Sequence, residues 1–192
     1  MAALAISAFL CVPAQAQDET RHEVSISYGV VPNSIWLDIL DDVLSDVVGM
    51  KYERDGYVGP IALEYFYHTT PLVGVGAIAT FVNDKKKGHN NDQITSQAVN
   101  SNFTIMPAVK FNWLRRANWG VYSKVAAGAT FRHFSEDFNN NGNKNTLTDN
   151  KVLFNFQVSA LGIETGIKNV VGYAELGIGE QGIGLVGIRY KF

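Results

Sequence analysis

The sequence has few of the residues that support redox chemistry or binding to charged polymers. One of its 192 residues is cysteine, the formal net charge is -2, and 18% of the residues are charged, against about 25% in an average soluble domain. A single cysteine cannot form an internal disulfide. A nearly neutral chain also gives no basic surface for nucleic acid, so we expect no nucleic-acid partner.

Long apolar runs and the spacings typical of bound cofactors are missing as well. The body of the chain has no run of about 18 or more apolar residues, which argues against a membrane-spanning helix. No metal-ligand spacing, phosphate-binding glycine loop or nucleophile elbow is present. The glycines of GVGAI and GIGEQGIG lie inside predicted strands with no helix after them. We therefore expect neither a metal nor a cofactor.

The N-terminal segment MAALAISAFLCVPAQAQ has a short apolar centre followed by Ala14 and Ala16, which flank Gln15. This A-x-A pattern is typical of signal-peptidase cleavage. We expect residues 1–16 to be a signal peptide and residues 17–192 to form one domain. A buried N-terminal helix is the alternative. Cys11 follows Leu10, where a lipid-acceptor site needs a small residue, so we expect no lipid anchor.

Alternation of apolar and polar residues is the dominant pattern. In GLVGIRYKF, for example, the apolar residues fall at every second position and Arg189 and Lys191 lie between them. About eight segments repeat this period of two, the mark of a strand. Several exceed the usual strand length of about 5–6 residues. Such segments predict an all-β fold, an eight-stranded antiparallel transmembrane β-barrel. A soluble lipocalin-like barrel or sandwich is the alternative.

The connections between the predicted strands are unequal. Short turns are expected at 69–72, 115–118 and about 165–169 on one side. On the other side we expect loops at about 32–55, 84–99 and 135–150 and a short one at 180–182. The longer loops are rich in Asn, Asp and Lys. Short periplasmic turns and longer external loops are typical of outer-membrane barrels.

These features resemble the small eight-stranded outer-membrane barrels of Gram-negative bacteria, of the OmpX and OmpA-transmembrane type, over residues 17–192. The resemblance implies a monomer in the outer membrane, in contact with its lipids and lipopolysaccharide. It also implies that the barrel assembly machinery reads the C-terminal IRYKF, in which Ile188, Tyr190 and Phe192 share one face.

Charged residues on the polar faces of the strands are expected inside the barrel. They are Glu64, Lys110, Lys124, Arg132, Glu175 and Arg189. The interior of an eight-stranded barrel is just wide enough for side chains to fill it, and buried charges must be paired. The hypothesis is a charged network that plugs the lumen, with Glu175 facing Arg189. A narrow ion path is the alternative.

The first external loop contains an amphipathic pattern over residues 34–48. Its apolar face includes Trp36, and Asp38, Asp41, Asp42 and Asp46 lie on the opposite face. This predicts one short amphipathic helix. Three roles remain open: packing on the barrel rim or outer leaflet, docking of a partner protein, or gathering of a divalent cation that bridges lipopolysaccharide phosphates.

A weak catalytic candidate lies in FRHFSEDF, where His133 and Ser135 share a face and Glu136 is adjacent. A His-x-Ser pair on a small barrel resembles the lipid A deacylases. The favoured interpretation is nevertheless a non-enzymatic outer-membrane protein that serves envelope structure, adhesion or the binding of a surface ligand or partner protein through its external loops. A lipid A-modifying enzyme and a narrow channel are the alternatives.

Overall fold

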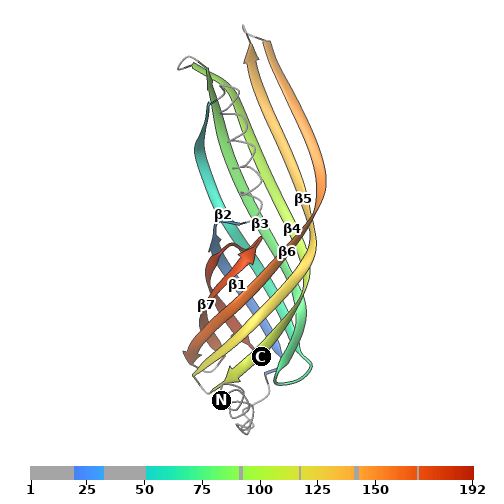
Figure 1. Cartoon of the computed structure of the whole chain (residues 1–192), viewed down its shortest axis with the longest axis vertical. Coiled ribbons are helices and arrows are strands. Elements are labelled where there is room, and N and C mark those ends of the chain that lie inside the picture. Colours follow the sequence, from blue (N-terminus) through green and yellow to red (C-terminus); the bar gives the residue numbers. More distant parts are fainter. Residues whose placement is uncertain (1–19, 33–50, 91–92, 117, 141–142, 168) are drawn as a thin grey trace, which may run out of the picture.

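The computed structural model describes residues 20–32, 51–90, 93–116, 118–140, 143–167 and 169–192. In them the chain forms one closed antiparallel barrel (Figure 1). Each strand pairs with the strands before and after it in the sequence, and β1 pairs with β8 to close the barrel. The strands are β1 (His22–Val30), β2 (Lys51–His68), β3 (Val73–Asn90), β4 (Gln93–Arg115), β5 (Trp119–Asn140), β6 (Asn143–Ile167), β7 (Val170–Gly179) and β8 (Gly184–Lys191). The fold class predicted from the alternation is confirmed.

Side chains alternate between the outer surface and the interior of the barrel. In β1, Val24 and Ile26 are exposed, whereas Glu23 and Ser25 are buried. Exposed large apolar side chains occur on all eight strands. An apolar exterior around a polar interior inverts the arrangement of a soluble protein and is the arrangement of a barrel surrounded by lipid. Among the described residues, no helix has the length and apolar character needed to cross a membrane.

The interior is not uniformly charged. Phe66, Ile78 and Met106 are fully buried and form an apolar cluster with small residues of β2, β4 and β5. The predicted charged lumen did not include this apolar cluster. The cluster fills part of the lumen without polar groups that need partners, which limits the charged network to the rest of the cross-section.

The strands differ in length, so the barrel has an uneven rim. β2 and β3 contain 18 residues each and β6 contains 25, whereas β1, β7 and β8 contain 9, 10 and 8. Figure 1 shows β2 to β6 continuing as a curved sheet beyond the ends of β1 and β7, away from the C-terminus. We call this extension the protruding sheet.

The protruding sheet corrects two of the predicted loops. Regions 84–99 and 135–150 were expected to be irregular, but β3 continues to Asn90, β4 begins at Gln93, and β5 and β6 are paired up to Asn140 and Asn143. The connections are 91–92 and 141–142. The backbone ladder needs no apolar side chains where water covers both faces, so polar composition alone does not end a strand.

The turn between β7 and β8 bends into the barrel. Gly179 and Gly182 have φ values of 142° and 103°, which side chains with a Cβ rarely adopt. They bracket Glu180 and Gln181, both fully buried. The short loop expected at 180–182 is therefore present, and it contributes side chains to the lumen.

Two predictions concern residues outside the described part of the chain. They are the signal peptide at residues 1–16 and the amphipathic helix at residues 34–48, including Trp36, Asp38, Asp41, Asp42 and Asp46. Both stay predictions.

Candidate functional site

The lumen contains two connected clusters of charged side chains. The first lies toward the end of the barrel that holds the C-terminus and is centred on Glu23 of β1 and Glu164 of β6. Lys110 Nζ lies 2.8 Å from Glu23 Oε2, and His68 Nε2 lies 2.9 Å from Glu23 Oε1. Lys191 donates to Glu164 Oε1. Five strands thus place these side chains within hydrogen-bond reach of one another.

The second cluster is centred on Lys124 of β5, which is fully buried. Its Nζ lies 2.6 Å from Glu64 Oε1 of β2 and 2.9 Å from Glu175 Oε2 of β7. Gln181 of the inward turn donates Nε2 to Glu64 Oε1 at 2.6 Å, and the Tyr122 hydroxyl donates to Glu175 Oε1 at 2.7 Å. The β7–β8 turn is therefore bonded to β2, beyond the neighbouring strand β1.

Arg189 of β8 connects the two clusters. Its Nη1 lies 2.7 Å from Glu164 Oε2 in the first cluster, and its Nη2 lies 3.6 Å from Glu64 Oε2 in the second. The guanidinium also packs on two aromatic rings, with Cζ 4.2 Å from the centre of Tyr173 and 4.9 Å from that of Tyr122. Such stacking suits a planar, weakly hydrated cation.

The charges in this network balance. Four carboxylates meet four cations, and the sets are Glu23, Glu64, Glu164 and Glu175 against Lys110, Lys124, Arg189 and Lys191. Removing a buried charge from water costs several kcal/mol, which only good pairing offsets. These paired side chains give this part of the lumen the chemistry of a plug. Among the described residues, no group of three His, Cys, Asp or Glu side chains is arranged to hold a metal ion.

The structure places the six predicted lumen residues on the inner side of the wall and joins five of them. Glu64, Lys110, Lys124, Glu175 and Arg189 belong to the network above. The sixth, Arg132, is half-buried farther up β5 and donates Nε to Asn100 Oδ1 at 3.1 Å.

Glu175 and Arg189 both face the lumen, as predicted, but they are not direct partners in the strand ladder. Arg189 lies opposite Val171 in the strand ladder, and Glu175 lies opposite Leu185. The two charged groups approach to 3.9 Å, between Arg189 Nη2 and Glu175 Oε1. The shorter ion pair of Arg189 is with Glu164, because its long side chain reaches across the lumen to β6.

Glu23 and Glu164 were not predicted to be lumen residues, for different reasons. Glu23 precedes the exposed Val24 in the alternation of β1, so its inward orientation could have been predicted from the sequence. Glu164 was not, because β6 contains a register shift between Ser159 and Leu161. Ala160 and Leu161 both face outward, and the phase of the alternation changes after them. Without this bulge, Glu164 would face lipid.

His133 and Ser135, the weak catalytic candidates, lie on β5 above the barrel wall. His133 is exposed, and its Nδ1 lies 2.7 Å from Oδ1 of Asn150, its partner on β6. Ser135 is half-buried and lies opposite Thr148. The side chain of Glu136 lies outside the described residues. Among the described residues, the hydrogen bond of the imidazole goes to Asn150 and not to Ser135.

The C-terminal aromatic residues lie on the outer surface at the lower end of the barrel. Phe192 and His22 exchange backbone hydrogen bonds of 2.9 Å, and their rings stack with centroids 5.3 Å apart. Tyr190 stacks on Phe192 at 5.7 Å, and Ile188 is exposed on the same face. These residues join β8 to β1. Their role as an assembly signal stays a prediction.

The upper part of β6 is an unpaired sheet edge in the described structure. Residues 143–156 of β6 pair with β5, but pairing with β7 begins only at Gln157, opposite Gly179. Side chains on both faces of residues 147–152 are exposed. Leu147, Val152 and Phe154 are 60%, 66% and 78% exposed. A backbone edge with apolar side chains along it is a template for another strand.

No family model matches the sequence, and no curated protein matches it. Among solved structures, the chain is similar to Ail, the attachment invasion locus protein of Yersinia pestis, with 14% identity, a TM-score of 0.44, and coverage of 90% of this chain and 97% of that one. A second structure of Ail, in complex with the heparin analogue sucrose octasulfate, shows 13% identity, the same TM-score and the same coverage.

Proposed function

We propose that this protein is a non-enzymatic barrel of the Gram-negative outer membrane that binds an external polypeptide through the free edge of β6. The barrel anchors the protein, the charged network closes its lumen, and the protruding sheet presents the binding surface. The observation that carries this proposal is that, among the described residues, β6 pairs with no strand on its second side over residues 143–154.

The apolar outer surface supports the location in a membrane. Phe103 and Ile105 of β4 are 44% and 47% exposed, and Trp113, near the other end of the strand, is 67% exposed. In water, this much apolar surface would drive association. In a bilayer, the closed barrel satisfies every ladder hydrogen bond, and the apolar faces are solvated by hydrocarbon. The segment at residues 1–16, as interpreted above, directs such a barrel out of the cytoplasm.

The backbone of the β6 edge is oriented for strand addition. The Phe156 carbonyl accepts a hydrogen bond of 3.0 Å from the Glu180 N–H on the β7 side. In an antiparallel strand the N–H and C=O of one residue point to the same side, and every second residue repeats the direction. Phe154 and Val152 therefore direct their N–H and C=O groups away from β5, toward the open edge. An extended peptide that pairs there would gain main-chain hydrogen bonds and contact the exposed side chains.

Charged side chains limit this edge to selective pairing. Lys151 and Asp149 are exposed and form an ion pair of 2.8 Å. Charges on an edge strand oppose indiscriminate association with other sheets. A partner must therefore match these charges as well as the apolar positions, which favours a particular partner over aggregation.

The test removes edge donors without disturbing the β5 ladder. Proline lacks an N–H and is tolerated on an edge strand, so Val152→Pro and Phe154→Pro each remove one outward donor. The controls Val152→Ser and Phe154→Ser keep the donor and remove the apolar side chain. The variants are expressed on the surface of a non-adherent laboratory bacterium, and adhesion to cultured epithelial cells is counted. Purified protein in lipid nanodiscs is also used to select binders from a displayed library of extended peptides.

Each lost backbone hydrogen bond is worth about 0.5–1.5 kcal/mol, so we expect the double proline variant to bind selected peptides about tenfold more weakly and to lose adhesion. The serine controls should retain part of both. Equal adhesion and peptide binding by the proline variants and the wild type, with all proteins folded, would refute strand addition at β6.

A further inference from the structure

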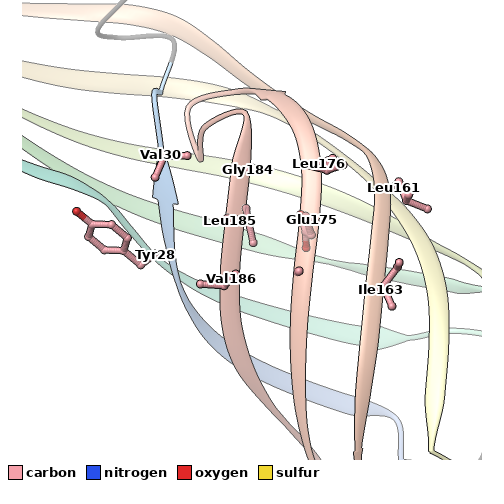
Figure 2. Close-up of a pocket in the computed structure, with 10 residues that line it drawn as sticks. Tyr28, Val30, Leu161, Ile163, Glu175, Leu176, Gly184, Leu185 and Val186 are labelled. Atoms are coloured by element: carbon pink, nitrogen blue, oxygen red, sulfur yellow. The ribbon is translucent and has the colours of Figure 1, made fainter.

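The outer wall of the barrel contains a groove that the proposed function does not use. It has a volume of about 470 Å³ and crosses the outward face of β7 and β8 between β1 and β6 (Figure 2). Its lining side chains are almost entirely apolar on the outward side. Its lining includes Tyr28, Leu161, Ile163, Leu176, Gly184 and Val186.

The groove is deepest over β7 and β8, where the outward-facing side chains are small. Gly184 of β8 and Ala174 of β7 lie there. A Cβ added at Gly184 would contact only Leu176 Cδ2 and Val30 Cγ2, each at 3.9 Å, which is ordinary van der Waals contact. The space above Gly184 is therefore open to a larger group without displacement of the backbone.

The two sides of the groove are held in place by separate features. On one side, the Tyr28 hydroxyl accepts a hydrogen bond of 3.1 Å from the Gly59 N–H of β2, so its ring is tied away from β8. On the other side, the β6 bulge turns Leu161 outward next to Ala160, and Leu161 with Ile163 forms a ridge. The groove is thus part of the folded wall and does not depend on a freely rotating side chain.

Position and chemistry together indicate what occupies the groove. It lies on the membrane-facing wall near Val30 and the β7–β8 turn, at the end of the barrel from which the sheet protrudes. Its lining offers no charged group to a ligand from the outward side, so a polar ligand would lose its hydration without compensation. An open apolar groove of about 470 Å³ on this wall suits a hydrocarbon chain.

We propose that the groove binds one acyl chain of lipid A in the outer leaflet. This inference rests on the proposed orientation, in which the protruding sheet faces outward, but it does not depend on strand addition at β6. The bound chain lies over Gly184 and Ala174 between Tyr28 and the Leu161 ridge. A phospholipid chain and a second copy of the protein are the other possible occupants, and the experiment distinguishes both.

The experiment measures contacts in nanodiscs by NMR. The protein is deuterated except for Leu, Val and Ile methyl groups, lipid A is protonated, and the phospholipid chains are deuterated. We expect nuclear Overhauser effects from lipid A methylenes to Leu161, Leu176 and Val186 that are several-fold stronger than those to Val125 on β5, which is also exposed on the outer wall. A second sample exchanges the labels between lipid A and phospholipid, and a third mixes labelled and unlabelled protein.

Two matched variants test the groove itself. Gly184→Leu places a side chain in the open space described above and should reduce the lipid A signals at Leu176 and Val186 several-fold. Gly172→Leu adds the same side chain on the outward face of β7 outside the groove, where an added Cβ would contact only the Thr165 carbonyl oxygen at 3.8 Å. It should leave the signals unchanged, and the amide spectrum of each variant reports whether the barrel is intact.

Three results would overturn the proposal. Signals of equal strength at Val125 and in the groove would mean ordinary lipid contact all round the barrel. Strong groove signals from phospholipid only, or between protein copies, would identify the other occupants. Peptide binding and adhesion, measured on the β6 proline variants, remain independent of these outcomes, so failure of one proposal is separable from failure of the other.

Discussion

Arg189 on β8 and Glu164 on β6 form an ion pair of 2.7 Å across the lumen, although β7 separates their strands. Both side chains are buried. Because the guanidinium also lies near Glu64 and Glu23, this one cation serves several carboxylates. The network therefore depends on Arg189 more than on any pair of neighbours in the ladder.

Replacing Arg189 should strongly destabilise the barrel. Arg189→Met leaves Glu164 without its 2.7 Å partner, and loss of one member of a buried pair costs about 3–5 kcal/mol. Urea titration in detergent micelles, followed by tryptophan fluorescence, measures the free energy of unfolding. The control is Arg116→Met, because Arg116 is exposed in the β4–β5 turn and such substitutions change stability by about 0.5 kcal/mol or less. Equal stability of the two variants would contradict the role given to Arg189.

Glu64 and Lys124 should be energetically coupled. Their charged atoms are 2.6 Å apart and both residues are fully buried. In a double-mutant cycle with Glu64→Gln and Lys124→Met, the double variant should be less destabilised than the sum of the single variants, by about 0.5–3 kcal/mol. Unfolding of all four proteins under the same conditions supplies the cycle. Strict additivity would indicate that the two charges do not stabilise each other.

The filled lumen should not conduct ions. Side chains of Glu64, Lys124 and Gln181 occupy its cross-section and are bonded to one another. In planar bilayers we expect no stable channels from the wild type. The triple variant Glu64→Ala, Lys124→Ala, Gln181→Ala removes this layer and should produce discrete conductance steps if it folds. Stable wild-type channels of uniform size would favour the ion-path hypothesis over the plug.

Gly182 should be sensitive to even the smallest side chain. Its φ is 103°, and a Cβ would lie 2.2 Å from the Val30 carbonyl oxygen. Strain of this kind costs on the order of 1–3 kcal/mol, so Gly182→Ala should lower the free energy of unfolding by at least this amount. Gly172→Ala is the control, because the space around Gly172 is open. A Gly182→Ala variant as stable as the control would mean that the inward turn is not constrained as described.

The β6 bulge should set the facing of Glu164 through one extra residue. Deleting Ala160 removes that residue, and strict alternation then keeps Leu161 outward and Glu164 in the lumen. We therefore expect the deletion variant to form a folded barrel, as judged by the gel mobility of unheated samples. Ala160→Val keeps the residue count and should also fold. A deletion variant that does not fold would show that the bulge has a role beyond the phase of the alternation.

Most of the barrel was predictable because hydrocarbon imposes a simple rule on side chains. The alternation of Ile188, Arg189 and Tyr190 places each correctly without any tertiary information. The rule fails where its period is interrupted, and Glu164 beyond the bulge is the example. It also fails above the membrane, where water covers both faces of a strand and the Asn-rich sequence around Asn140 and Asn143 gives no sign that the ladder continues.

The site was less predictable than the fold, since partners inside a barrel come from strands that are not adjacent. The alternation shows that Arg189 faces inward, but whether it meets Glu175 or Glu164 depends on strand tilt and side-chain reach. Gln181 was treated as part of a short loop, and only the glycine geometry of that turn directs it to Glu64.

The position of Arg189 and Lys191 on the last strand has a consequence for biogenesis. Before β8 pairs with the rest of the sheet, Glu23 and Glu164 lack two of their cationic partners, Arg189 and Lys191. The incomplete sheet therefore carries excess negative charge on the face that becomes the barrel interior. Docking of β8 neutralises that charge at the same moment as it joins the first strand. In an incomplete or misordered intermediate the acidic groups would remain hydrated, which opposes pairing of β1 with β8. The electrostatic balance thus favours the correctly closed barrel.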